Sequence, residues 1–299
     1  MSAKVVIPWS TTHPGYTRPL CSAFLKSLGC HVIKADEDPE GSKSPGGPSD
    51  TYAGGSESFV YANAASNADV LQAEARQLVA THDKVCRQDQ VNPVLTEVLN
   101  PGEAYPQLQY LRDLADQAAG QADALLLPGG SDIEPWLYGQ SPLATTDNIT
   151  DHRRSILEMH LLKVATTRGL PVLAICRGSQ MLNVFWGGQL IQQLQNHFVE
   201  EKAMDIEIVS QESSSGLRQA SILQGLTREN KFSAASFHHQ ATDPANLGGL
   251  GAASGFNMLE VTAQSGEVVK AFETRYGAPV MAFQIHPEFW AHDNYMVGN

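Results

Sequence analysis

The sequence predicts an α/β protein: a three-layer sandwich with a central, mostly parallel β-sheet covered by helices, extended by a β-hairpin. Short apolar runs that are typical of buried strands alternate with segments of helical periodicity. Two of these runs end at Gly129-Gly130 and at Cys176, and ligands of open α/β sheets bind at the carboxyl ends of the strands. With 299 residues, the chain is long enough for one large domain with a sizeable core.

The N-terminal part of the chain predicts a strand over residues 4–9, followed by an early helix. Residues 41–50 are rich in Gly, Pro and Ser and predict a loop that buries no apolar area. Apolar residues at helical spacing predict helices over 62–86 and 106–119. We interpret residues of about 36–110 as an atypical insertion in a single domain spanning the chain. The sequence does not decide whether this insertion caps the active site or forms an interface.

The middle of the chain predicts two strands, each followed by a helix. Residues 122–127 form the first apolar strand. Thr150 or Asp151 caps the next helix, and Gly169 closes it. The second strand then ends at Cys176.

The C-terminal third has a different pattern. Residues 258–263 and 268–274 predict a β-hairpin around a short polar turn. We expect this hairpin to hold the last predicted strand, residues 278–285, against the sheet.

Cys176 stands where an apolar strand turns directly into an amphipathic helix, which Gly187-Gly188 ends. Such a turn brings the sulfur into the open, and the helix N-terminus beside it favours a negatively charged thiolate. Gly178 lets the backbone pack tightly behind the turn. A buried structural cysteine is the alternative, and this segment alone does not decide between the two.

His286-Pro287-Glu288 follows the last predicted strand and favours a catalytic cysteine. Residues two apart on an extended segment point the same way, so the imidazole and the carboxylate can share one face. A carboxylate in that place fixes the histidine tautomer and stabilises the imidazolium that forms when the ring takes a proton from a thiol. Because 286 − 176 = 110 residues separate them, Cys176 and His286 must meet through the fold.

Gly129 and Gly130 follow the strand over residues 122–127. Paired glycines at the carboxyl end of a strand let main-chain N–H groups face a ligand, as an oxyanion hole requires. On its own, this segment predicts only a turn.

Together, these segments resemble the class I glutamine amidotransferase-like superfamily, and within it the gamma-glutamyl-gamma-aminobutyrate hydrolase family. The resemblance covers about residues 122–290 and implies a flavodoxin-like fold. Residues from about 36 to 110 do not match the family. Arg154-Ser155 stands where relatives usually carry Arg-Asp, a change that touches no proposed catalytic atom. The matching segments are residues 128–142, the nucleophile block 169–188, Ser236-Phe237-His238-His239-Gln240-Ala241 and Gln284-Ile285-His286-Pro287-Glu288-Phe289.

The resemblance implies a Cys-His-Glu triad. Cys176 would attack a gamma-glutamyl amide carbon, His286 would shuttle the proton, and Glu288 would orient His286. Backbone amides of Arg177 and Gly130 would hold the oxyanion, with Gly129 as the alternative donor.

The resemblance also implies residues on the substrate side. Gln180 would lie near the glutamyl group, and His238 and His239 belong to a substrate-side motif. Adjacent residues on a strand face opposite ways, so at most one of the two histidines should reach the pocket. The expected partners are a small gamma-glutamyl substrate and water. No metal ion or organic cofactor is implied.

Composition argues against several other partners. A formal net charge of −12 without a basic stripe disfavours nucleic acid and anionic membranes. The sequence contains no long apolar run, so we expect neither a membrane-spanning helix nor a signal peptide. The four cysteines show no metal-like spacing, so we expect a reduced, cytoplasmic protein; the sequence leaves a homo-oligomer open.

Three functions compete at this stage. The first is a cysteine hydrolase of gamma-glutamyl amides, acting through a gamma-glutamyl thioester that water resolves. The second is a glutaminase subunit that passes ammonia to a partner synthase; the 128–142 segment disfavours it. The third is a catalytically silent scaffold with the same fold, which the presence of all three triad residue types disfavours.

Overall fold

The fold is described from a computed structural model, which covers residues 2–8, 17–36, 56–61, 68–82, 92–143, 150–194, 198–209, 211–212, 218–219, 221–249, 259–275 and 277–289. The predicted loop over 41–50 lies outside these residues, as does Cys86. The helices and 3-10 turns are α1 (Thr17–Ser27), α2 (Ala68–His82), α3 (Pro93–Leu99), α4 (Pro106–Gly120), η1 (Pro135–Tyr138), α5 (His152–Arg168), α6 (Arg177–Phe185), α7 (Ile222–Thr227), η2 (Pro244–Asn246) and η3 (Pro287–Phe289). The strands are β1 (Lys4–Pro8), β2 (His31–Asp36), β3 (Ser56–Tyr61), β4 (Ala124–Leu127), β5 (Val172–Ile175), β6 (Leu190–Ile191), β7 (Phe198–Ile208), β8 (Gln211–Glu212), β9 (Arg218–Gln219), β10 (Lys231–Phe237), β11 (Ala241–Thr242), β12 (Leu259–Ser265), β13 (Val268–Thr274) and β14 (Val280–Phe283).

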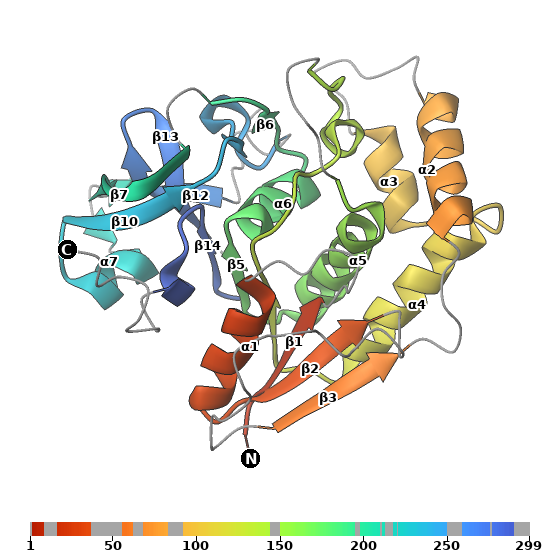
Figure 1. The fold of residues 1–299 in the computed structure, drawn as a ribbon, viewed down its shortest axis with the longest axis horizontal. Helices are drawn as coiled ribbons and strands as arrows, with labels where there is room; N and C mark the ends of the chain where they lie inside the picture. The colour runs from red at the N-terminus through yellow and green to blue at the C-terminus, as the bar shows by residue number, and fades with distance from the viewer. Residues whose placement is uncertain are drawn as a thin grey trace.

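A ten-stranded sheet forms the centre of the molecule, in the order β10-β7-β12-β13-β14-β5-β4-β1-β2-β3 (Figure 1). All neighbours from β14 to β3 pair in parallel. The neighbours from β10 to β14 pair antiparallel. The predicted α/β fold with a mostly parallel sheet is therefore confirmed, and an antiparallel half is joined to the parallel half at β14.

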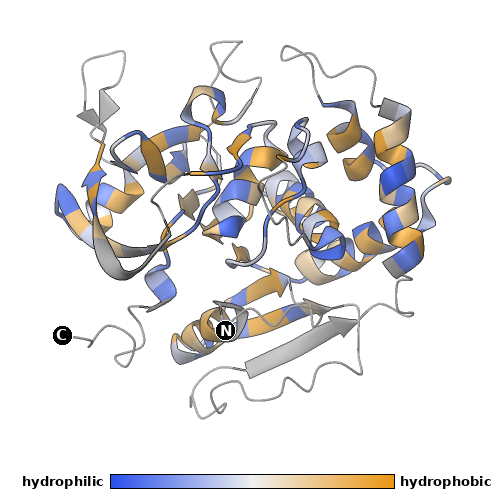
Figure 2. Ribbon diagram, turned by 45° about the horizontal axis from the view of Figure 1, so that its top comes forward, coloured by the Kyte–Doolittle hydropathy of each residue, from blue (hydrophilic) through white to orange (hydrophobic). Residues whose placement is uncertain are grey.

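Helices cover both faces of the parallel half, which gives the three layers. On one face, Cys21 and Leu25 of α1 pack against Val5, Val32 and Ile175. On the other face, α4, α5 and α6 bury their leucines in a larger core with alternate residues of the same strands. In Figure 2, β1 and β2 are largely hydrophobic, whereas the helices alternate between hydrophobic and hydrophilic residues. This pattern follows from strands that are buried on both sides and helices that are buried on one.

The predicted helices have clear chemical boundaries. Asp151, not Thr150, caps α5, and its side chain accepts a hydrogen bond from the N–H of Arg154. Gly169 ends α5 in the left-handed conformation, as predicted. Pro106 is in the first turn of α4, where its missing N–H is harmless.

The described residues of the 36–110 segment belong to the same layers as the rest of the fold. β3 extends the parallel sheet by pairing with β2. Leu71 and Leu78 of α2, together with Val94 and Val98 of α3, are buried in the core that contains α4 and α5. This part of the chain therefore widens the sheet and its helical layer.

The predicted hairpin is present, because β12 and β13 pair antiparallel around Gly266. β13 also pairs with β14, so the hairpin holds the strand that precedes His286, as expected. Within the described residues, no helix is long and apolar enough to cross a membrane.

The fold brings three predicted site segments to one edge of the sheet. β14, β5 and β4 are parallel neighbours. Their carboxyl ends lead into Gln284-Ile285-His286, Cys176 and Pro128-Gly129-Gly130, respectively. The candidate oxyanion donors, the candidate nucleophile and the candidate base therefore lie at the carboxyl ends of neighbouring strands, which is where α/β sheets bind ligands.

Candidate active site

Cys176 occupies a strained turn between β5 and α6. Its backbone has φ 51° and ψ −108°, a conformation that L-residues seldom adopt. Gly178 makes the turn possible, because a Cβ there would lie within 2.8 Å of the carbonyl carbon of Leu127. The structure therefore has the sharp strand-to-helix turn that the sequence predicts, but Cys176 is 6% exposed, so the turn does not bring it into the open as expected.

His286 lies beside the sulfur of Cys176. Burial by itself would lower the pKa of His286, but the charge of Cys176, a hydrogen bond with its sulfur and the carboxylate of Glu288 raise this pKa to about 10. An imidazole with such a pKa is protonated at neutral pH. His286 therefore places a positive charge beside the sulfur, an arrangement that activates a cysteine as a nucleophile.

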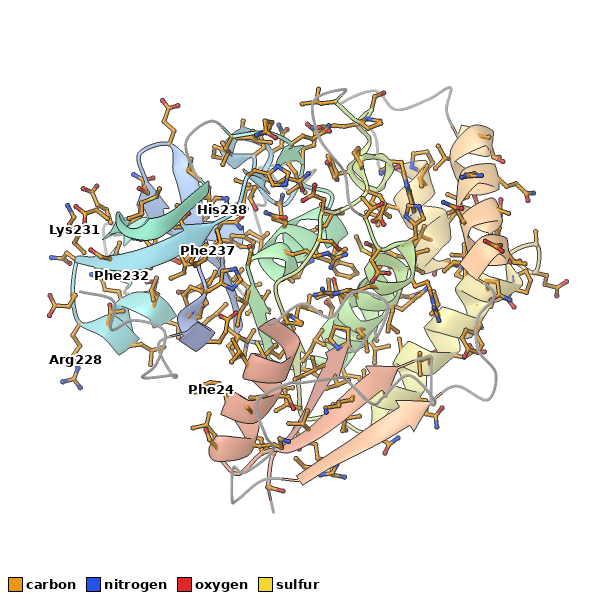
Figure 3. All side chains as sticks on the ribbon, in the orientation of Figure 1. Phe24, Arg228, Lys231, Phe232, Phe237 and His238 are labelled. Atoms are coloured by element: carbon orange, nitrogen blue, oxygen red, sulfur yellow. The ribbon has the colours of Figure 1, made fainter. Side chains whose placement is uncertain are left out.

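Glu288 holds His286 from the other side. Its Oε1 atom lies 2.7 Å from Nδ1 of His286, and both side chains are almost fully buried. The contact leaves Nε2 of the ring for the sulfur and for a leaving group. The ring of Phe237, labelled in Figure 3 at the end of β10, packs edge-on against the imidazole at a centroid distance of 6.1 Å.

The predicted oxyanion donors, Arg177 and Gly130, come from α6 and from the loop after β4. Arg177 is the first residue of α6, so its N–H has no partner within the helix. Gly130 follows the neighbouring strand, and a Cβ there would collide with the guanidinium of Arg154. Glycine is therefore needed at this position for the loop to approach the site closely.

A buried ion network that the sequence analysis missed supports these donors. Glu158 is fully buried and pairs with the side chains of both Arg154 and Arg177. Arg154 also donates to the carbonyl oxygen of Pro128 at 2.7 Å. Arg177 donates to the hydroxyl of Ser155 at 2.7 Å. The network therefore holds in place the two segments that carry the predicted oxyanion donors. Its members do not include Cys176, His286 or Glu288.

Gln180 belongs to an amide network under the site. Its Nε2 donates to the carbonyl oxygen of Gln240 at 2.9 Å and to Oε1 of Gln284 at 3.1 Å. Nε2 of Gln284 in turn lies 3.7 Å from the sulfur of Cys176. The amide nitrogen of Gln180 thus positions neighbouring residues, and its predicted contact with substrate stays a prediction.

His238 and His239 contact different partners, but they follow the end of β10 and do not lie on a strand, contrary to the prediction from the sequence. His238 is buried, with Nδ1 2.7 Å from the carbonyl oxygen of Gln240 and Nε2 2.8 Å from Nζ of Lys270. His239 is half-buried, with Nε2 3.0 Å from Asp132. The roles of His238 and His239 toward substrate stay predictions.

Lys270 is a second residue that the sequence analysis missed. It lies on β13 with 1% of its surface exposed, and Nζ also donates to the hydroxyl of Ser236 at 3.1 Å. Burial lowers the pKa of Lys270 to about 8, against the opposing effect of the charge of Cys176. The site therefore contains a buried cation in addition to His286.

Comparisons with known proteins identify the family of this chain. Residues 72–288 match the model of the Peptidase C26 family. A glutamine amidotransferase-like protein of Lactococcus lactis, YvdE, is 35% identical over 173 residues, which are 56% of this chain and 66% of YvdE. A gamma-glutamyl-gamma-aminobutyrate hydrolase of Escherichia coli is 38% identical over 82 residues, 27% of this chain and 31% of that enzyme. The chain thus matches less than two thirds of the length of these relatives.

A glutamine amidotransferase structure from Thermotoga maritima aligns with 96% of this chain and 77% of its own, at 11% identity and a TM-score of 0.45.

The family match and the curated relatives make this chain a member of the class I glutamine amidotransferase-like superfamily, a class of cysteine-dependent amidohydrolases. Within this class, the chain belongs to the Peptidase C26 family.

Proposed function

We propose that this protein hydrolyses the gamma-glutamyl amide bond of small gamma-glutamyl compounds, through a gamma-glutamyl thioester on Cys176. The observation that carries the proposal is the position of His286 between the sulfur of Cys176 and the carboxylate of Glu288. The partial similarity to a gamma-glutamyl-gamma-aminobutyrate hydrolase supports the substrate class.

The first half-reaction forms the thioester. The thiolate of Cys176 attacks the gamma-carbonyl carbon, and the carbonyl oxygen becomes an oxyanion that the N–H groups of Gly130 and Arg177 stabilise. The tetrahedral intermediate then collapses and breaks the C–N bond. His286, protonated in the resting site, gives its proton to the departing amine.

The second half-reaction consumes water. His286, now neutral, takes a proton from a water molecule that attacks the thioester carbon. Collapse of this second intermediate breaks the C–S bond, releases the glutamate product and restores the thiolate of Cys176 and the protonated imidazole. Glu288 accepts a hydrogen bond from Nδ1 of His286 throughout, which keeps Nε2 directed at the reacting atoms.

The test is incubation with gamma-glutamyl amines and with glutamine, following free glutamate and amine. We expect turnover of gamma-glutamyl amines by the parent protein, its loss in Cys176→Ala, and its retention in Cys30→Ala, which removes a partly exposed cysteine. Hydroxylamine should trap the intermediate as gamma-glutamyl hydroxamate.

Other outcomes select the alternatives. Glutamine hydrolysis that appears only on addition of a partner synthase would identify a glutaminase subunit. Absence of turnover, together with a Cys176 that resists iodoacetamide, would identify a silent scaffold.

A further inference from the structure

We propose that Lys270 is a carboxylate-binding residue of the acyl side of this site, so that the enzyme selects acyl groups that carry a negative charge. The inference deepens the proposed function and rests on it for the identity of the acyl group. Its starting point is a buried ammonium group that forms no salt bridge with a carboxylate within the described residues.

The first step concerns the charge of the Lys270–His238 pair. Nδ1 of His238 faces the carbonyl oxygen of Gln240, which only accepts, so Nδ1 carries the ring proton. Nε2 of His238 faces the ammonium of Lys270, which only donates, so Nε2 is the acceptor. His238 is therefore neutral, and the pair carries the single positive charge of Lys270.

The second step concerns the acids around the site. Glu288 is paired with His286, Glu158 with two arginines and Asp132 with His239. Each of these carboxylates is thus already engaged by another side chain. A buried cation without an anionic partner is costly, which indicates that an anion occupies this place during function.

The third step concerns the position of Lys270 relative to the nucleophile. The N–H of Gln284 donates to the carbonyl oxygen of Lys270 at 2.9 Å, and the side chain of Gln284 contacts the sulfur of Cys176. The charge of Cys176 also acts on Lys270. The ammonium group of Lys270 is therefore part of the proposed catalytic site. It is close enough to attract a negatively charged group of a ligand that is bound there.

The fourth step concerns the hydrogen-bonding capacity of the ammonium. Nζ of Lys270 has three N–H donors, and Ser236 and His238 take two of them. One donor remains for a ligand. A gamma-glutamyl group has a carboxylate and an ammonium at its far end, and only the carboxylate is attracted to Lys270.

A substrate-independent experiment tests the cation at the site. We measure the alkylation rates of Cys176 by iodoacetate, which is negatively charged, and by neutral iodoacetamide, using peptide mass spectrometry at pH 7. The ratio of the two rates cancels the general reactivity of the thiolate and reports the local charge. We expect Lys270→Met to lower this ratio about tenfold, whereas Lys231→Met, on the exposed start of β10 (Figure 3), leaves it unchanged. A ratio in Lys270→Met within twofold of that of the parent protein overturns the proposal.

Two further measurements keep the test decisive if Lys270→Met does not fold. Lys270→Arg keeps the positive charge and should retain the iodoacetate preference. The parent protein alone should show a ratio about tenfold above that of glutathione, a thiol without a fixed cation. A parent ratio equal to that of glutathione overturns the proposal without any variant.

Substrate analogues test the specificity itself. The panel is gamma-glutamyl p-nitroanilide, glutaryl p-nitroanilide, which lacks the amine, and 4-aminobutyryl p-nitroanilide, which lacks the carboxylate. We expect the parent protein to favour the first two at least about 100-fold in kcat/KM, and Lys270→Met to lose this preference. An equal loss on all three anilides refutes carboxylate recognition. If no anilide is hydrolysed, the proposed function fails, while the alkylation ratio still decides the role of Lys270.

Discussion

Replacing Glu158 with Gln removes the negative charge between two buried arginines while keeping the size of the side chain. Glu158, Arg154 and Arg177 are 0%, 3% and 1% exposed, so water cannot replace the lost carboxylate. Breaking a buried ion pair by changing one partner costs about 3–5 kcal/mol. Unfolding entropy is about 2.1 cal/mol/K per residue, or roughly 0.6 kcal/mol/K for a chain of 299 residues. We therefore expect the Tm of Glu158→Gln to fall by about 5–8 °C.

Thermal unfolding followed by circular dichroism measures this change. Glu103→Gln, which neutralises an exposed acid, is the matched control and should leave the Tm within about 1 °C of the parent value. A Tm of Glu158→Gln within about 2 °C of the parent protein would refute the reasoning, because it would show that the two guanidinium groups do not depend on this carboxylate.

Three further predictions concern the catalytic residues and the turn that presents them. Glu288→Gln should lower kcat for gamma-glutamyl amines by up to about 10⁴-fold, and unchanged steady-state turnover would show that Glu288 does not orient the base. The pKa of His286 is raised from 6.5 to about 10 on folding, so its contribution to stability is complete below pH 6.5 and is lost as the pH rises through 10. Urea unfolding at several pH values should show this decline, and His286→Asn should flatten it; a parent protein whose stability does not fall over this range contradicts the assignment. Gly178→Ala should cost about 1–3 kcal/mol, because its Cβ would meet the backbone of Leu127, whereas Gly120→Ala, with open space around it, should be neutral or stabilising in the same unfolding experiment.

The residues that the sequence places correctly are those whose neighbours along the chain determine their geometry. Cys176 lies between an apolar strand and a helix, and this local pattern is sufficient to predict the strained turn. Glu288 follows His286 by two residues, and the predicted contact between their side chains is present at 2.7 Å, although Glu288 lies in the 3-10 turn η3 and not on the predicted extended segment. Asp151 and Gly169 bound α5 through rules that act within a few residues.

The residues that the sequence analysis missed depend on contacts between distant segments. Arg154 and Glu158 are four apart on a helix, a spacing that usually indicates an exposed ion pair. In the structure this pair is buried and also includes Arg177 of α6, a contact that the spacing within α5 does not predict. Lys270 stands in a strand whose residues from Val268 to Glu273 are all buried, so no alternation marks the direction of its side chain.

The strands at the ends of the sheet show the same limit. The two outermost strands at each end, β2 and β3 and β7 and β10, were not predicted, although the hairpin of β12 and β13 was. A hairpin is specified by a short turn and two adjacent runs. An edge strand depends on a partner elsewhere in the chain, and its sequence does not identify that partner.

The place of β14 in the middle of the sheet has a consequence for biosynthesis. This strand is made after β5 and β13, yet it lies between them. Before residues 280–283 have left the ribosome, one edge of β5 has no neighbouring strand. Unpaired strand edges of this kind promote the aggregation of nascent chains. Contacts of such long sequence separation also slow folding. His286, which follows β14, therefore reaches its place beside Cys176 only when the two halves of the sheet have joined.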